Sequence, residues 1–116
     1  MKAFAAFAVL LLAPLAAHAA CAPTDFEIRD FKPAAAAGRL SLRGELVNKC
    51  AAASAAQIRI EIKDAAGKVL QSKQAWPAGT SNIAPGSNVN FDLGRMFRPQ
   101  SDMDSFTASV VDVRTW

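Results

Sequence analysis

Two cysteines, Cys21 and Cys50, are the residues of this 116-residue chain whose chemistry is easiest to define. They do not form a Cys-x-x-Cys motif, and the only histidine that could activate a thiol is His18. Redox catalysis is therefore disfavoured. We predict a structural disulfide between the two, which is the usual state of paired cysteines in an oxidising compartment. In the entropic model, closing a loop of about 30 residues stabilises a fold by roughly 3.5 kcal/mol.

The N-terminal segment predicts export, which would supply that oxidising compartment. Lys2 precedes an apolar stretch that continues to Ala13, and small residues follow, including an Ala-His-Ala triplet at 17–19. This order is typical of a cleaved secretory signal peptide. The apolar core is short for a membrane span, since crossing a bilayer takes about 20 residues. The Ala-His-Ala triplet predicts a mature start at Ala20, and cleavage before Cys21 is the alternative. We assign residues 1–20 to a signal peptide and residues 21–116 to one periplasmic or secreted domain.

Lipid attachment at Cys21 is an alternative fate of the same junction. Two alanines precede this cysteine, as in the lipobox of bacterial lipoproteins. His18 stands where a lipobox has leucine, so the match is partial. Lipidation would leave Cys50 without a partner and would make the chain a lipid-anchored envelope accessory protein.

Removal of residues 1–20 would leave few functional groups for catalysis. The remainder has no histidine and no tyrosine, and it holds twelve Lys and Arg residues against ten Asp and Glu residues. These cations are spread singly along the chain, whereas nucleic-acid-binding proteins carry a basic stripe or patch. We therefore expect solvated cationic side chains on strand faces and no nucleic-acid partner.

Candidate catalytic and metal sites are weak. The one tight acidic cluster is Asp102-Met103-Asp104-Ser105, and its two carboxylates and hydroxyl fall short of the six to eight oxygens that Ca²⁺ takes. No glycine-rich phosphate-binding loop and no Ser-x-x-Lys motif at a helix start is present. The sequence predicts a protein that is not an enzyme and that has no cofactor and no metal. A histidine-free enzyme is the less favoured alternative.

Alternation of apolar and polar residues predicts the elements of the domain. It is clearest at Ile58, Ile60 and Ile62, which are separated by charged residues. The other expected strands cover 25–32, 39–49, 69–76, 89–93 and 106–113. Each would have one buried and one solvated face. Six to seven such strands predict an all-β, immunoglobulin-like antiparallel β-sandwich, with a small closed barrel as the alternative.

Turn residues separate these strands. We expect Gly67 at positive φ in a hairpin and Pro85-Gly86 in a type II turn. The alanine-rich segment 51–56 is expected to be a loop. A turn at 33–38 would pair the first two strands as an antiparallel hairpin. The numbers of two residues that lie opposite each other would then sum to about 70–72. The numbers of Cys21 and Cys50 sum to 71. The cysteines would then share one end of the hairpin, one residue out of register.

Aromatic and arginine side chains in the expected loops are the candidates for an interaction surface. They are Trp76, Arg95, Phe97 and Trp116. Such residues are typical of interface hot spots. Alternatively, Trp76 and Phe97 close the ends of the sandwich core, because a small core needs large side chains. Trp116 alternatively completes the last strand.

Several segments follow one pattern of strand and turn residues. They are Ile60-Glu61-Ile62-Lys63-Asp64, Gly67-Lys68-Val69-Leu70, Ile83-Ala84-Pro85-Gly86, Phe91, and Leu42-Arg43-Gly44-Glu45-Leu46-Val47-Asn48. This pattern resembles the bacterial FxLYD-type domain over nearly all of residues 21–116. Ile60 and Lys63 stand where that family has Phe and Tyr. The resemblance implies an exported, immunoglobulin-like β-sandwich without an assigned activity, and it transfers no catalytic residues.

These observations predict a non-catalytic protein-interaction or structural module of the cell envelope. Its expected partner is another envelope protein, and no membrane span is expected after cleavage. The sequence favours this function over the lipid-anchored and enzymatic alternatives.

Overall fold

The structure is a computed structural model that describes residues 21–116. The predicted signal peptide, residues 1–20, lies outside the described residues, so export and lipid attachment stay predictions. Within residues 21–116, no helix is long and apolar enough to cross a membrane.

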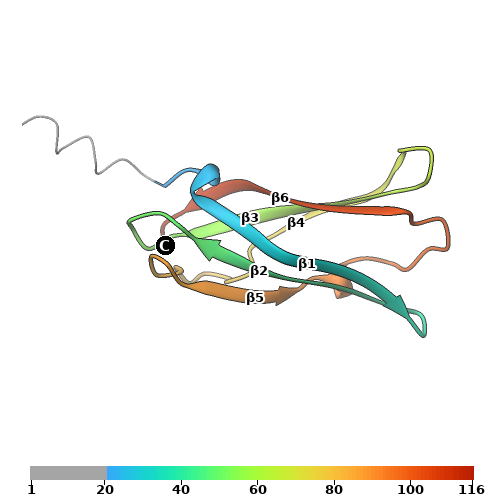
Figure 1. Ribbon diagram of the computed structural model, residues 1–116, viewed down its shortest axis with the longest axis horizontal. Helices are drawn as coiled ribbons and strands as arrows, with labels where there is room; N and C mark the ends of the chain where they lie inside the picture. The colour runs from blue at the N-terminus through green and yellow to red at the C-terminus, as the bar shows by residue number, and fades with distance from the viewer. Residues whose placement is uncertain (1–20) are drawn as a thin grey trace, which may run out of the picture.

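Six antiparallel strands form two three-stranded sheets that pack face to face (Figure 1). The strands are β1 (Phe26–Ala36), β2 (Arg39–Asn48), β3 (Ala55–Lys63), β4 (Val69–Ala75), β5 (Asn88–Asp92) and β6 (Ser105–Arg114). One sheet has the order β1-β2-β5 and the other β4-β3-β6, so the chain changes sheet after β2, β4 and β5. Two short 3-10 turns, η2 (Pro23–Asp25) and η3 (Gly94–Met96), precede β1 and follow β5. The predicted all-β sandwich is confirmed.

The core lies between the two central strands. Ile58, Ile60 and Ile62 of β3 are at most 1% exposed, and they face Leu42 and Leu46 of β2, which are fully buried. Their polar neighbours along each strand point outward, as the alternation predicted. Central strands bury their apolar face completely because a paired strand flanks each of them on both sides.

The β1–β2 hairpin differs from the prediction in both turn and register. Strand β1 continues through Pro33 to Ala36, and the turn consists of Ala37 and Gly38, with φ angles of 53° and 76°. Two consecutive positive φ angles are typical of a type I′ hairpin turn. Proline is tolerated in β1 because β1 is an edge strand. The alanines after it carry little strand signal, so the sequence pattern placed the turn too early.

The observed register follows from this turn and from a β-bulge. Paired residue numbers sum to 75 near the turn, as in Ala36 opposite Arg39, and to 74 at the open end, as in Phe26 opposite Asn48. The change of register lies between Arg29 and Lys32, where Asp30 has a φ of 54°. A bulge adds one residue to one strand. The predicted sum of about 70–72 was therefore wrong by several residues.

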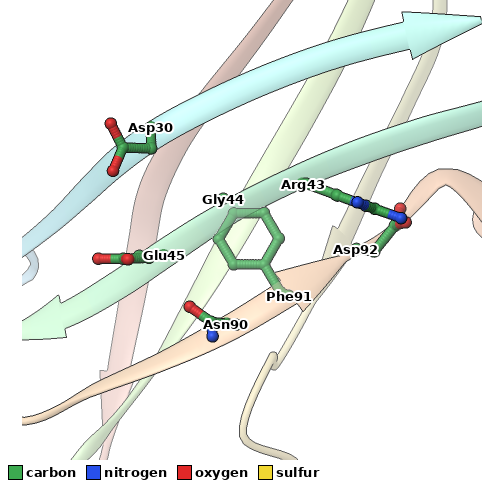
Figure 2. A pocket seen from close by; sticks show the side chains of 7 residues that line it. All are labelled: Asp30, Arg43, Gly44, Glu45, Asn90, Phe91 and Asp92. Atoms are coloured by element: carbon green, nitrogen blue, oxygen red, sulfur yellow. The ribbon is translucent and has the colours of Figure 1, made fainter.

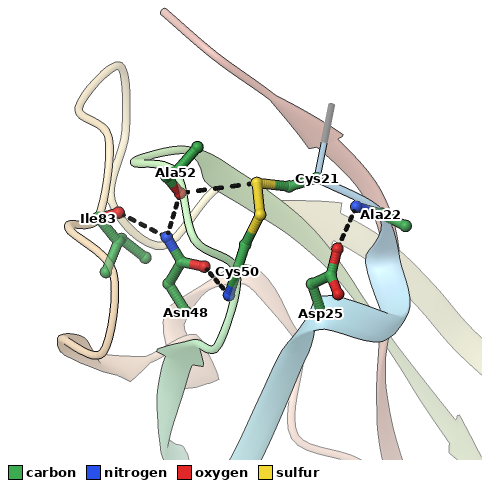
Figure 3. Close-up of a disulfide and its surroundings, with 7 residues drawn as sticks. All are labelled: Cys21, Ala22, Asp25, Asn48, Cys50, Ala52 and Ile83. Carbon is green, nitrogen blue, oxygen red and sulfur yellow. Dashed lines mark hydrogen bonds between the residues drawn. A yellow bond between two sulfur atoms is a disulfide. The ribbon is translucent and has the colours of Figure 1, made fainter. Parts of the chain in front are cut away.

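The Cys21–Cys50 disulfide is present, as predicted, and joins Cα atoms that are 5.9 Å apart. The observed register would place Thr24, not Cys21, opposite Cys50, so the offset is three residues and not one. The compact η2 turn absorbs this offset. A hydrogen bond from the Ala22 backbone N–H to the Asp25 side-chain carboxylate, at 2.8 Å, stabilises this turn (Figure 3).

The other turns agree largely with expectation. Gly67 has a φ of 85°, and Gly86 has a φ of 78° in a turn closed by the Ser87 N–H and the Ala84 carbonyl at 3.0 Å. The expected loop at 51–56 is shorter than predicted, because Ala55 and Ala56 begin β3. Both are buried by pairing with Arg114 and Val113 of β6, which a short alanine run does not reveal.

Gly44 in β2 is required by its cross-strand neighbour. It pairs with Phe91 of β5, and a Cβ atom on Gly44 would lie 2.7 Å from the Phe91 Cζ atom. Because the Phe91 ring is buried, Gly44→Ala is expected to lower the free energy of unfolding by about 1–3 kcal/mol. Urea denaturation of both proteins measures this loss. In a double-mutant cycle, Phe91→Leu should relieve part of it; additive effects of the two substitutions would contradict the predicted clash.

Candidate functional site

A groove of about 720 Å³ lies between the tip of the β1–β2 hairpin and η3. Three guanidinium groups line it: Arg39 and Arg43 come from β2, and Arg95 comes from η3. Leu40, Phe97 and Pro99 also line it and supply apolar surface. We call this hollow the arginine groove.

The groove exists because β2 is longer than β5. Strand β5 pairs with β2 only as far as Asp92 opposite Arg43, and η3 then packs against the rest of β2. The Leu93 N–H donates to the Leu42 carbonyl at 3.1 Å. Gly94 lies so close to β2 that a Cβ atom there would collide with the Leu40 carbonyl oxygen. This close approach fixes Arg95 beside the hairpin.

The floor of the groove belongs to the sandwich core. Leu40 and Phe97 are 9% and 6% exposed, and both pack with Ile60 and Ile62. The Lys73 ammonium lies 5.9 Å from the centre of the Phe97 ring, within the range of a cation–π contact. Phe97 is thus a plug of the core, as one of the two interpretations proposed, and it also borders the groove.

Asp92 organises the wall of the groove. Its carboxylate accepts hydrogen bonds from the Leu42 N–H at 2.9 Å, the Gly94 N–H at 3.0 Å and the Ser41 hydroxyl at 3.2 Å. The Arg43 Nε atom lies 3.4 Å away. Partial burial raises the pKa of Asp92, but these donors together outweigh it and hold the pKa below its ordinary value. Asp92 is therefore charged at neutral pH.

A second hollow of about 490 Å³ lies beside the groove and shares Arg43 and Asp92 with it. Figure 2 shows the Phe91 ring next to Gly44, with the side chains of Arg43 and Asp92 meeting on one side of the ring. Its other charged members are Asp30 and Glu45. This hollow is shallow and its charges are mixed, so it favours no single ligand.

Asp92→Asn tests the role of this carboxylate. The folded pKa lies below the unfolded value, so the stabilisation is present above pH of about 4 and is lost as the pH falls through the folded pKa. We expect Asp92→Asn to destabilise the fold by about 1 kcal/mol near neutral pH, because charge-assisted hydrogen bonds are weakened. The difference should shrink toward pH of about 2. Urea denaturation at both pH values checks this, and an equal loss at both would contradict it.

Trp76 and Trp116 form a separate cluster beyond the ends of β4 and β6. Their rings meet edge to face with centres 5.8 Å apart. The Arg114 guanidinium lies 5.5 Å from the Trp76 ring and 5.0 Å from the Trp116 ring. The Asn82 side chain accepts from the Trp116 N–H at 2.9 Å and fixes the backbone there. Trp116 is 46% exposed, so this cluster is only partly buried.

The four predicted contact residues therefore lie in two places. Arg95 and Phe97 border the arginine groove, whereas Trp76 and Trp116 contact each other edge to face near the start of β3, where Arg114 pairs with Ala55. The sequence reasoning missed three cations that complete these sites: Arg39, Arg43 and Arg114. A signal for two of them was present, because Arg39 and Arg43 are four positions apart in a strand and so share one face.

The acidic segment 102–104 lines a shallow hollow of about 460 Å³ together with Asp64, and it forms no compact ligand set. Within residues 21–116, no group of three or more His, Cys, Asp or Glu side chains is placed to hold a metal ion.

No family model, curated protein or solved structure matches this chain. The resemblance to FxLYD-type domains stays a prediction.

Proposed function

We propose that this chain is a non-catalytic interaction module of the cell envelope, an exported immunoglobulin-like sandwich of the FxLYD type. In this proposal, the arginine groove is the surface that contacts an envelope protein. One observation carries the proposal: three exposed arginines, Arg39, Arg43 and Arg95, line one hollow on backbone that the core holds in place. Arginine side chains are typical of interface hot spots.

Two arginines of the groove form no ion pair within the described part of the chain, which supports the groove as the contact surface. Among the described residues, Arg43 pairs with Asp92, but neither Arg39 nor Arg95 lies within ion-pair distance of a carboxylate. Exposed cations that hold no intramolecular partner are free to bind an external anion without first breaking an ion pair.

The disulfide bears on the lipid-anchored alternative. A lipid on Cys21 would be attached through the sulfur atom that the structure joins to Cys50. The two states exclude each other, so the soluble form is favoured. Mass spectrometry of the exported protein separates them: we expect a loss of two hydrogens that a reductant reverses, and an acyl mass on Cys21 would contradict the soluble form.

An affinity capture from envelope extract tests the proposed function. The wild-type domain should retain a partner that the Arg39→Ala, Arg95→Ala double variant releases. The matched control is the double variant Lys63→Ala, Lys68→Ala, which removes the same charge at the end of β3 and in the turn before β4, outside the groove. If both variants retain the same proteins as the wild type, the arginine groove is not the contact surface. A Trp116→Ala arm shows whether the tryptophan cluster binds instead.

A further inference from the structure

We infer that the arginine groove takes an acidic peptide segment of a partner protein, which places carboxylates on Arg39 and Arg95. This inference rests on the proposed function and names the chemistry of the partner.

The charge of the groove selects an anion. Its lining holds three arginines and one carboxylate, that of Asp92. Asp92 is already saturated by hydrogen bonds from Leu42, Gly94 and Ser41 and by the contact with Arg43. The positive charge of Arg39 and Arg95 is therefore uncompensated within the described chain. Guanidinium groups bind carboxylates through paired, charge-assisted hydrogen bonds.

The position of the cations favours a peptide segment over a compact ion. Arg39 belongs to β2 and Arg95 to η3, and both line a hollow of about 720 Å³. A peptide segment can place one carboxylate on each of these elements, whereas a single phosphate fills only a small part of that volume.

The apolar lining that a ligand can reach is small. Leu40 and Phe97 are 9% and 6% exposed and pack into the core, so Pro99 is the exposed apolar side chain among those that line the groove. The arginines therefore carry most of the recognition.

The test uses the full exported protein and fluorescein-labelled peptides in an anisotropy titration. The first peptide alternates glutamate and leucine, and the second alternates glutamine and leucine. We expect the glutamate peptide to bind at least about tenfold more tightly than the glutamine peptide. Its affinity for the double variant Arg39→Gln, Arg95→Gln should be about tenfold lower than its affinity for the wild type. The matched Lys63→Gln, Lys68→Gln variant should bind as the wild type does. Rising salt should weaken binding, because exposed charges are screened.

Other probes separate the alternatives. Inorganic phosphate and vesicles that contain phosphatidylglycerol are titrated under the same conditions. Binding of either probe through Arg39 and Arg95, without binding of the glutamate peptide, would overturn the inference in favour of a phosphate or lipid ligand. Equal binding of the glutamate and glutamine peptides would also overturn it.

Failure of this inference can be distinguished from failure of the proposed function. If the envelope partner is released by Arg39→Ala with Arg95→Ala but the glutamate peptide does not bind, the function stands and the acidic segment is wrong. If neither the captured partner nor the peptide depends on these arginines, both proposals fail. Circular dichroism of each variant verifies that a loss of binding does not come from unfolding.

Discussion

Asn48→Ala is expected to lower the free energy of unfolding by about 2–4 kcal/mol, because three hydrogen bonds of a fully buried side chain would be lost together. Asn48 is fully buried at the end of β2. Its Nδ2 atom donates to the carbonyls of Ala52 at 3.0 Å and Ile83 at 2.7 Å, and its Oδ1 atom accepts from the Cys50 N–H at 2.8 Å (Figure 3). Alanine would remove these bonds from the Ala52 carbonyl and the Cys50 N–H, would leave the Ile83 carbonyl with only the Ser54 N–H at 3.2 Å, and would open a small cavity.

Urea denaturation followed by circular dichroism measures this effect. Asn88→Ala is the matched control, because the exposed Asn88 side chain makes only a 3.3 Å hydrogen bond to Glu45. We expect that control to change stability by less than about 0.5 kcal/mol. If Asn48→Ala were as mild as Asn88→Ala, the interpretation of Asn48 as an anchor for both neighbouring loops would be wrong.

Removal of the disulfide is expected to cost about 3–4 kcal/mol. Cys21 and Cys50 are 29 positions apart, and the bond ties the start of the described chain to the loop that leaves β2. The double variant Cys21→Ala, Cys50→Ala avoids a free thiol. Its free energy of unfolding should match that of the wild-type protein measured in a reductant, and the two values should lie within about 0.5 kcal/mol of each other. Wild-type stability that is unaffected by the reductant would contradict this prediction.

The two effects should not be additive. Asn48 and the disulfide both hold the loop at 49–54, since the Asn48 side chain contacts Cys50 and Ala52. Once one restraint is lost, the loop is already partly released, so removal of the other costs less. A cycle that combines Asn48→Ala with the double cysteine variant should therefore show a coupling energy of about 1 kcal/mol or more.

Local patterning accounts for what the sequence could predict of the fold. Isoleucines at alternating positions identified β3, because one of its faces is buried and the other is only half-buried. The same rule failed in β1, where exposed alanines follow Pro33 on an edge strand and no buried face marks the continuation. The bulge at Asp30 was also invisible, since it depends on how β1 fits β2 and not on a local motif. The disulfide was predictable from the chemistry of the two cysteines, but the offset of Cys21 from the β1–β2 register was not.

Long-range packing accounts for what could not be predicted of the candidate site. Arg95 and Phe97 were identified as a pair because they are close in the chain. Their proximity to Arg39 depends on the close contact between Gly94 and Leu40, which no short-range pattern encodes. The contact of Arg114 with both tryptophans likewise requires that β4 and β6 flank β3 on its two sides. Only the shared face of Arg39 and Arg43 was available from spacing.

The β1–β2 hairpin has a consequence for the order of folding. Its strands, its turn and its disulfide all lie within residues 21–50, so this unit can form from local contacts alone, which form fastest. The other strand that pairs with β2, strand β5, does not begin until Asn88. During that interval β2 presents an unpaired edge, and such an edge can pair with another chain. The time between synthesis of β2 and arrival of β5 is therefore when this protein is most exposed to aggregation.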